Sequence, residues 1–426
     1  QGTRLGFAKP KGEYDLALPS RKTLFRLQAD RILRVRALAA ERAGKPIEEV
    51  RLPLYVMTSP MTDADTRAFF ASQKNFGLGG DEGVFFFQQG TLPCLTTDGK
   101  IMLEAATKVA EAPDGNGGIY RGLHLSGAMA HMDAAGVKFV HAFAVDNAVC
   151  RVADPVFAGY CVSNGADVGS KVCWKVAPEE KVGVLCRKGG RFAVVEYSDM
   201  ADALKELRDD SGELTYGAGN VCIHFYTTDF LREKCSPEAL PRDYHLARKK
   251  IPYAHEETGA TVPKSELTDN TGVKLESFIF DVFPASESMA SLVVDRAAEF
   301  SPVKNAPGNP VDSPDSARSI FSDLHKGWLA AAGVTMEGDG LGEVSGLVSY
   351  AGEGLSAFSG QTLQAPFLVR RVDEGPFDPL AEALAAAGDG EAMDGGITRK
   401  ALSHPTLGDI NVYLVDGGAF PGKFAE

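Results

Sequence analysis

Two glycines and two cations stand together at the start of the chain. It opens with Gln1-Gly2-Thr3-Arg4-Leu5-Gly6, and Pro10-Lys11 follow. Glycine lets backbone amides approach phosphate oxygens closely, while Arg4 and Lys11 supply positive charge. The segment is neither a Walker A loop nor a G-x-G-x-x-G dinucleotide turn, because the spacing of each is missing. The residues alone indicate either a phosphate-binding loop or a basic surface turn.

A carboxylate follows an apolar run further along the chain. Residues 139–145 are mainly apolar, and Asp146 comes next. Ligands of open parallel sheets bind at the carboxyl ends of strands, and a carboxylate there suits Mg²⁺, which prefers oxygen ligands. Asp is also common in turns and helix caps, which is the structural alternative.

Polar residues follow apolar segments at two more places. Gln89 comes after the apolar run 84–87, although an isolated Gln is usually a surface residue. Residues 114–118 read Asp-Gly-Asn-Gly-Gly, a composition typical of an ordinary turn. Phe278 and Phe280 are two apart, so on a strand they would share one face, and sheet core is the alternative interpretation. His245 and His255 are expected at the surface.

The elements that must position these residues alternate between helices and strands. Apolar residues at 25, 29, 32, 35 and 39 predict one face of a helix that ends at Gly44. Residues 52–57, 84–87 and 139–145 predict buried strands, and Thr62 with Asp65 predicts a capping box that opens a helix. Residues 182–186 and 192–196 predict a hairpin. The pattern indicates an α/β fold with a Rossmann-like, mixed but mainly parallel sheet.

Two segments rich in Pro, Gly, Asp and Ala interrupt this pattern. We interpret 305–318 as a linker and 372–397 as a surface excursion. The chain is therefore expected to form a catalytic core at 1–304 and a smaller C-terminal domain at 305–426.

Bulk properties exclude several classes of function. The net charge is −13, which argues against broad nucleic-acid binding. No apolar run is long enough for a membrane span. No pair of the seven cysteines has C-x-x-C spacing, so a zinc site is not expected. The missing G-x-G-x-x-G turn argues against a nicotinamide-dependent dehydrogenase.

Many short motifs, in order over roughly residues 1–370, resemble the UDP-N-acetylhexosamine pyrophosphorylases of the eukaryotic type. The resemblance begins at Gly2-Thr3-Arg4-Leu5-Gly6 with Pro10-Lys11. It continues at Phe87-Gln88-Gln89-Gly90, Val145-Asp146-Asn147, Val195-Glu196-Tyr197-Ser198, Gly217-Ala218-Gly219-Asn220 and Phe300-Ser301-Pro302-Val303-Lys304-Asn305.

The resemblance implies a uridylyltransferase that forms UDP-N-acetylglucosamine and pyrophosphate from UTP and N-acetylglucosamine 1-phosphate, with Mg²⁺ or Mn²⁺. The sugar phosphate is already an anion, so catalysis needs positioning and charge stabilisation rather than a strong base. By resemblance, the cations that act on the phosphates are Arg4, Lys11 and Lys304. The nucleotide is bound by Gly2, Gln89, Gly115 and Asn116, and the metal by Asp146. The sugar is bound by Glu196, Asn220, Phe278 and Phe280.

Alternatives remain open at this level. The same chemistry could act on N-acetylgalactosamine 1-phosphate or glucose 1-phosphate, and a catalytically silent nucleotide-binding homologue is a rival. The resembling family carries a Leu-x-x-Gly-Gly strand and turn before the phosphate loop, so we expect such a strand upstream of Gln1. We expect a cytoplasmic enzyme. Organellar targeting stays open because a targeting segment would lie in that upstream region.

Overall fold

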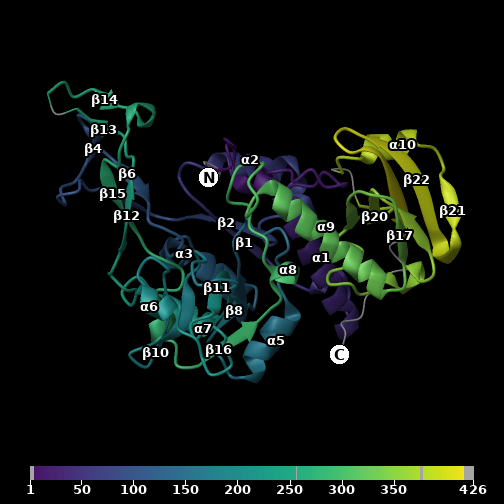
Figure 1. Ribbon diagram of the computed structural model, residues 1–426, viewed down its shortest axis with the longest axis horizontal. Helices are drawn as coiled ribbons and strands as arrows, with labels where there is room; N and C mark the ends of the chain where they lie inside the picture. The colour runs from purple at the N-terminus through teal and green to yellow at the C-terminus, as the bar shows by residue number, and fades with distance from the viewer. Residues whose placement is uncertain (1–3, 256, 375–377, 417–426) are drawn as a thin grey trace.

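The computed structural model describes residues 4–255, 257–374 and 378–416. Its largest sheet has six strands in the order β10-β9-β11-β8-β16, with β7 also paired to β11 (Figure 1). The pair β8 and β16 is parallel, whereas β11 runs antiparallel to β7, β8 and β9. The α/β class with a mixed sheet is thus confirmed. The strands are β7 (Phe139–Ala142), β8 (Val168–Trp174), β9 (Val184–Lys188), β10 (Arg191–Val195), β11 (Ala218–Thr227) and β16 (Met289–Val293).

A parallel pair, β1 (Leu54–Thr58) and β2 (Val84–Gln88), lies beside this sheet, and helix α1 (Leu24–Ala43) packs nearby. The helix begins where the Thr23 hydroxyl accepts from the Arg26 amide, and it ends at Gly44, which adopts a left-handed φ of 62°. Ala29, Ile32 and Val35 are buried as their spacing predicts. The capping box at Thr62 is wrong: its hydroxyl bonds Ser59 instead, and α2 (Asp63–Ser72) begins without a side-chain cap.

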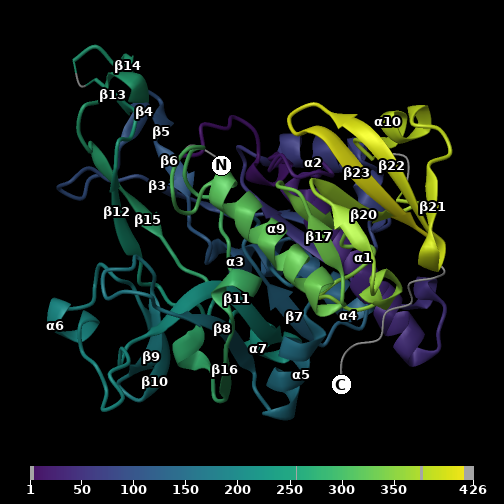
Figure 2. The same ribbon diagram turned by 45° about the vertical axis from the view of Figure 1, so that its right-hand side comes forward.

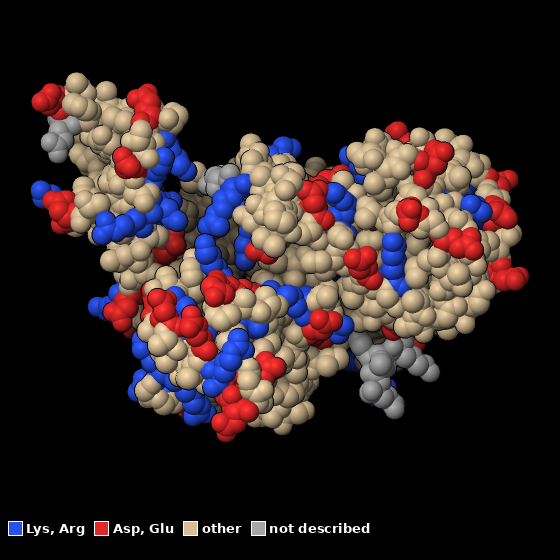
Figure 3. Space-filling view, viewed as in Figure 1, with Lys and Arg blue, Asp and Glu red and all other residues tan. Residues whose placement is uncertain are grey.

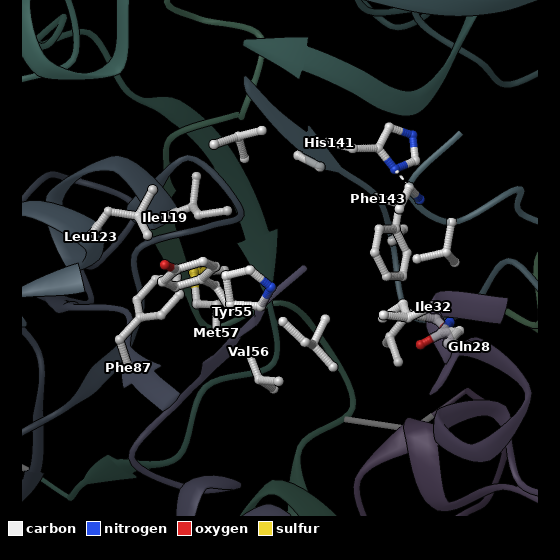
Figure 4. A pocket seen from close by; sticks show the side chains of 18 of the residues that line it. Gln28, Ile32, Tyr55, Val56, Met57, Phe87, Ile119, Leu123, His141 and Phe143 are labelled. Carbon is white, nitrogen blue, oxygen red and sulfur yellow. Dashed lines mark hydrogen bonds between the residues drawn. The ribbon is translucent and has the colours of Figure 1, made fainter. Parts of the chain in front are cut away.

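A cavity of about 880 Å³ separates β1 from β7. Figure 4 shows its two walls: Tyr55, Met57 and Phe87 on one side face His141 and Phe143 on the other. Among the described strands, β1 pairs only with β2, and β7 pairs only with β11. Each therefore has one backbone edge toward the cavity, and the side chains along it are largely apolar.

The remaining helices of this half are short and surround the sheet, and a slender arm of two-stranded ribbons projects from it (Figures 1 and 2). The helices are α3 (Gly118–Leu125), α4 (Ala128–Ala134), α5 (Pro155–Ser163), α6 (Asp202–Lys205), α7 (Thr228–Glu233) and α8 (Arg296–Glu299). The arm holds β3 (Thr91–Pro93) with β6 (Glu111–Pro113), β4 (Leu103–Ala105) with β5 (Lys108–Val109), β12 (His245–Lys249) with β15 (Gly272–Glu276), and β13 (Tyr253–Ala254) with β14 (Thr261–Val262).

A second, five-stranded sheet lies on the side of α1 that is opposite to the six-stranded sheet, and the long helix α9 crosses it (Figure 2). Residues 305–318 are not a linker throughout, because Ser313 caps α9 (Pro314–Ala331). The segment 372–397 contributes α10 and β21 rather than a bare surface loop. The elements are α10 (Ala381–Ala386), β18 (Gly342–Val344), β20 (Phe367–Arg371), β21 (Glu391–Met393), β22 (Ile397–His404) and β23 (Gly408–Val415), with the separate pair β17 (Thr335–Glu337) and β19 (Thr362–Gln364).

Buried charges join α1 to this second sheet. Lys22 Nζ lies 2.7 Å from Asp30 and 2.6 Å from Glu374, and all three side chains are almost fully buried. Glu343, on β18, accepts hydrogen bonds from the amide and the hydroxyl of Ser20. Because buried ions are costly unless paired, these contacts fix the amino-terminal segment rigidly against the second sheet. No helix in the described ranges is both long and apolar enough to cross a membrane.

Candidate active site

The predicted phosphate cation and the predicted metal ligand contact each other. Lys11 Nζ lies 2.9 Å from Asp146 Oδ2, and their side chains are only 16% and 17% exposed. Lys11 opens a short 3₁₀ turn, while Asp146 stands four residues beyond the end of β7. Residues separated by 135 positions are therefore brought together at one edge of the sheet.

The turn that carries Arg4 is anchored beside the same loops. Leu5 is buried in one apolar cluster with Ala148, Val149 and Val303. Arg4 itself is exposed. Its backbone is thus held near the segments that carry Asp146 and Lys304. Gly2 lies outside the described residues.

Asn147 fastens the Asp146 loop to the segment that carries Lys304. Its Nδ2 donates to the Glu299 carbonyl at 2.7 Å, and its Oδ1 accepts from the Ser301 amide at 2.9 Å. The Val303 amide also donates to the Asp146 carbonyl at 2.9 Å. The Lys304 side chain is 43% exposed, and its Nζ lies 3.8 Å from Asp312. The segments that carry Asp146 and Lys304 are therefore held together by a shared set of hydrogen bonds.

The loop 114–118 is closed by hydrogen bonds from two directions. Gln89 Nε2 donates to Asp114 Oδ1 at 3.0 Å and to the Gly115 carbonyl at 2.8 Å, and the Ile279 amide donates to Asn116 Oδ1 at 2.9 Å. Gly115 adopts φ 92°, and a Cβ there would lie 2.2 Å from the Ser277 carbonyl oxygen. The position therefore requires glycine. Gln89, Gly115 and Asn116 therefore lie together in this loop.

A bulge in β11 presents Asn220. The register with β8 shifts between Asn220 and Ile223, and Cys222 adopts an unusual φ of 55°. Strained backbone of this kind is concentrated at functional sites. Burial raises the pKa of the Cys222 thiol to about 11, and the charges of Lys304, Asp146 and Glu196 act on it. The bulge therefore lies within electrostatic range of the charged residues of the site.

An aromatic and acidic cluster lies on the other side of Lys304. Glu196 follows β10, and burial raises the pKa of its carboxyl, opposed by His245 and Lys304. The His245 ring stacks on Phe278 at 4.1 Å, and its Nε2 lies 2.9 Å from Asp281 Oδ1. The His245 side chain is 35% exposed and His255 is exposed, so both lie at the surface as predicted, although one face of the His245 ring covers Phe278.

Phe278 and Phe280 are not on a strand. They lie in the turn that follows β15, where the Phe278 amide donates to Asp281 Oδ2 at 2.6 Å. Their ring centroids are nevertheless 5.2 Å apart. The turn, rather than a pleated face, brings the two rings together.

Sequence reasoning missed three residues of this neighbourhood: Asn147, Asp281 and His224. His224 is fully buried in β11, inside the apolar run 221–226. A polar residue in such a run signals a buried group that needs hydrogen-bond partners. That signal was present in the sequence, whereas nothing local marks Asp281 as a partner of His245.

The described residues contain no group of three or more His, Cys, Asp or Glu side chains suited to enclose a metal ion. A lone carboxylate such as Asp146 fits the mode in which Mg²⁺ is held by one or two carboxylates and by substrate phosphates. Lys and Arg side chains border a hollow between the arm and the central body, although the net charge of the chain is −13 (Figure 3). Local positive charge of this kind suits anionic ligands.

Comparisons with known proteins show which family the chain resembles. Residues 1–309 match the family model described as UTP–glucose-1-phosphate uridylyltransferase. The chain is 46% identical to UDP-N-acetylglucosamine diphosphorylase 1 of Arabidopsis thaliana, over 86% of this chain and 72% of the relative. It is 44% identical to human UDP-N-acetylhexosamine pyrophosphorylase-like protein 1, over 87% of this chain and 75% of the relative.

A solved structure agrees as well. The uridine diphosphate N-acetylglucosamine pyrophosphorylase of Trypanosoma brucei matches with a TM-score of 0.72 and 32% identity, covering 83% of this chain and 73% of that one. The chain belongs to the uridylyltransferase family and, within it, to the UDP-N-acetylhexosamine pyrophosphorylases.

Proposed function

We propose that the protein forms UDP-N-acetylglucosamine and pyrophosphate from UTP and N-acetylglucosamine 1-phosphate. The observation that carries the proposal is the convergence of Lys11, Asp146 and Lys304 at one edge of the sheet, through the 2.9 Å ion pair and the 146–148 to 299–303 hydrogen bonds. Two cations beside one carboxylate suit a reaction between two phosphate-bearing substrates.

In the proposed step, an oxygen of the sugar phosphate attacks the α-phosphorus of UTP. A new phosphorus–oxygen bond forms, the bond from the α-phosphorus to the bridging oxygen breaks, and its electron pair leaves with pyrophosphate. Arg4 and Lys11 stabilise the charge that develops on the triphosphate, and Lys304 holds the sugar phosphate. Preorganised cations lower the barrier because they need no reorganisation during the reaction.

The binding of the base and the sugar is assigned to the neighbouring segments. We assign the uracil edge to Gln89 and to the 115–116 backbone, because an amide offers both a donor and an acceptor. The sugar is assigned to Glu196 and Asn220, whose side chains can bond its hydroxyl groups and the N-acetyl group. Phe278 and Phe280 would form an apolar wall for the acetyl methyl group.

Asp146 is the residue that would hold Mg²⁺ or Mn²⁺, together with phosphate oxygens of UTP. The ion supplies neutralisation of phosphate charge during transfer. The ion would replace Lys11 on the Asp146 carboxylate, and Lys11 would then be free to turn toward a phosphate.

We also propose that residues 1–304 form the catalytic core and 305–426 a smaller C-terminal domain, because the strands of the second sheet all lie beyond residue 304.

The function is tested by pyrophosphate release from UTP with a panel of sugar 1-phosphates. N-acetylglucosamine 1-phosphate should be used best, with N-acetylgalactosamine 1-phosphate and glucose 1-phosphate as comparisons. Equal use of all three would contradict the sugar assignment, and release with none would contradict the activity.

A further inference from the structure

A buried chain of hydrogen bonds runs from Asn220 to the turn at Ile279. His224 Nε2 lies 3.0 Å from Asn220 Oδ1, and Tyr226 Oη lies 3.2 Å from His224 Nδ1. The Tyr120 hydroxyl contacts both the Tyr226 hydroxyl, at 2.9 Å, and the Ile279 carbonyl, and its single proton is donated to one of the two at a time. The chain therefore connects Asn220 with the segment that holds Phe278 and Phe280, the two sides of the proposed sugar pocket.

The donors around Asn220 determine which end of its amide points to the site. The Cys222 amide donates to Asn220 Oδ1 at 3.2 Å, and a backbone N–H cannot accept, so the atom facing it must be the oxygen. His224 and the Ser170 hydroxyl, at 3.4 Å, face the same oxygen. Among the described residues, the contact of Asn220 Nδ2 is a weak one, with Cys222 Sγ at 3.9 Å. Its two N–H groups lie at the bulge, where the charges of Lys304 and Glu196 act on the neighbouring Cys222.

The proton on His224 follows from its partners. Burial lowers the pKa of His224 to about 3, so the ring is neutral and carries one N–H. The Asn220 oxygen can only accept, which requires that proton on Nε2. Nδ1 then accepts from the Tyr226 hydroxyl, which fixes this tautomer. Asn220, His224 and Tyr226 thus each have one assigned role in the chain.

We propose that His224, held by Tyr226, is a positioning residue that turns the Asn220 amide so that its N–H groups face the sugar, where they recognise an acceptor oxygen of the acetamido group. This inference rests on the proposed function. It makes acetamido selectivity depend on a residue that does not itself touch the substrate.

The test is the selectivity of His224→Phe, which keeps a ring of similar size and removes both nitrogen contacts. Without its donor, the Asn220 amide can rotate, so the ratio of kcat/KM for N-acetylglucosamine 1-phosphate to that for glucose 1-phosphate should fall about tenfold to a hundredfold. The loss should appear in the KM of the acetamido sugar, with the KM of UTP unchanged. His224→Gln restores a donor and should recover most of the ratio.

A matched control separates orientation from general loss of stability. His325 in α9 is also buried, and its Nδ1 accepts from the Val344 amide at 3.0 Å, remote from the bulge. His325→Phe should lower stability without changing the sugar ratio. If His224→Phe does not fold, Tyr226→Phe, which removes one oxygen and releases the tautomer, should lower the ratio in the same direction.

Direct binding gives a readout independent of turnover. In calorimetry, His224→Phe should weaken UDP-N-acetylglucosamine relative to UDP-glucose by the same factor. An unchanged ratio in foldable His224→Phe and Tyr226→Phe, with a collapsed ratio in Asn220→Ala, would overturn the positioning role. A wild-type protein that does not distinguish the two sugars would instead contradict the sugar assignment of the proposed function.

Discussion

Asn147→Ala should separate two loops that the proposed reaction needs together. Asn147 is 2% exposed, and its amide bonds the Glu299 carbonyl at 2.7 Å and the Ser301 amide at 2.9 Å. Truncation leaves both backbone groups buried without that partner. Each unsatisfied group costs about 1–3 kcal/mol, so the free energy of unfolding should fall by roughly 2–6 kcal/mol.

The effect on turnover should exceed the effect of lower stability. Asp146 and Lys304 flank the two bonded segments, and a displacement of about 1 Å between reacting groups can reduce the rate about 10²-fold. We therefore expect kcat to fall by about that factor under conditions in which the variant is fully folded. Urea unfolding measures the first quantity, and pyrophosphate release at saturating substrates measures the second.

Asn164→Ala is the matched control. Asn164 Nδ2 donates to the Tyr160 carbonyl at 2.8 Å at the exposed end of α5, away from Asp146 and Lys304. The control should cost little stability and no turnover, because water can replace its bond. Wild-type kcat in fully folded Asn147→Ala would refute the reasoning, since the two loops would then keep their geometry without the side chain.

Three further predictions concern charges. Arg4→Ala and Lys11→Ala should each reduce kcat about 10²-fold without unfolding the protein, and wild-type rates would remove them from the mechanism. Asp146→Asn should weaken the Mg²⁺ dependence of turnover, and full activity of the parent protein under complete chelation would contradict the metal role. Burial raises the pKa of Glu343 from 4.5 to about 7. The folded state then holds this proton more tightly than the unfolded chain, so the stability that it adds below pH 4.5 is lost as pH rises through 7. Glu343→Gln should flatten that slope by roughly 1–3 kcal/mol in urea unfolding at pH 5 and 8, and identical slopes would contradict it.

Local patterns predicted the elements whose determinants are local. The apolar spacing of α1 and its Gly44 terminus, and the hairpin of β9 and β10, follow from periodicity and turn residues. The Thr62 cap failed because the Ser59 turn competes for the same hydroxyl. The start of α9 inside the expected linker was missed, although Ser313-Pro314 is a helix-opening pair.

Motif positions predicted which residues belong to the site, and they did not predict the contacts between those residues. Lys11 was predicted as a phosphate cation and Asp146 as a metal ligand, but their ion pair is a contact across 135 residues that no local pattern encodes. The stacking of His245 on Phe278 depends on how the arm ribbon meets the turn after β15, which is set by tertiary packing. Local motifs therefore indicate the chemistry of the site, whereas the residues that orient the reacting groups depend on tertiary packing.

The fate of labelled UTP tests the central claim most directly. With N-acetylglucosamine 1-phosphate present, a label on the α-phosphorus should enter a UDP-sugar, and a label on the γ-phosphorus should leave entirely as pyrophosphate. Transfer of the γ-label to the sugar phosphate, or pyrophosphate release that does not depend on the sugar phosphate, would contradict attack at the α-phosphorus.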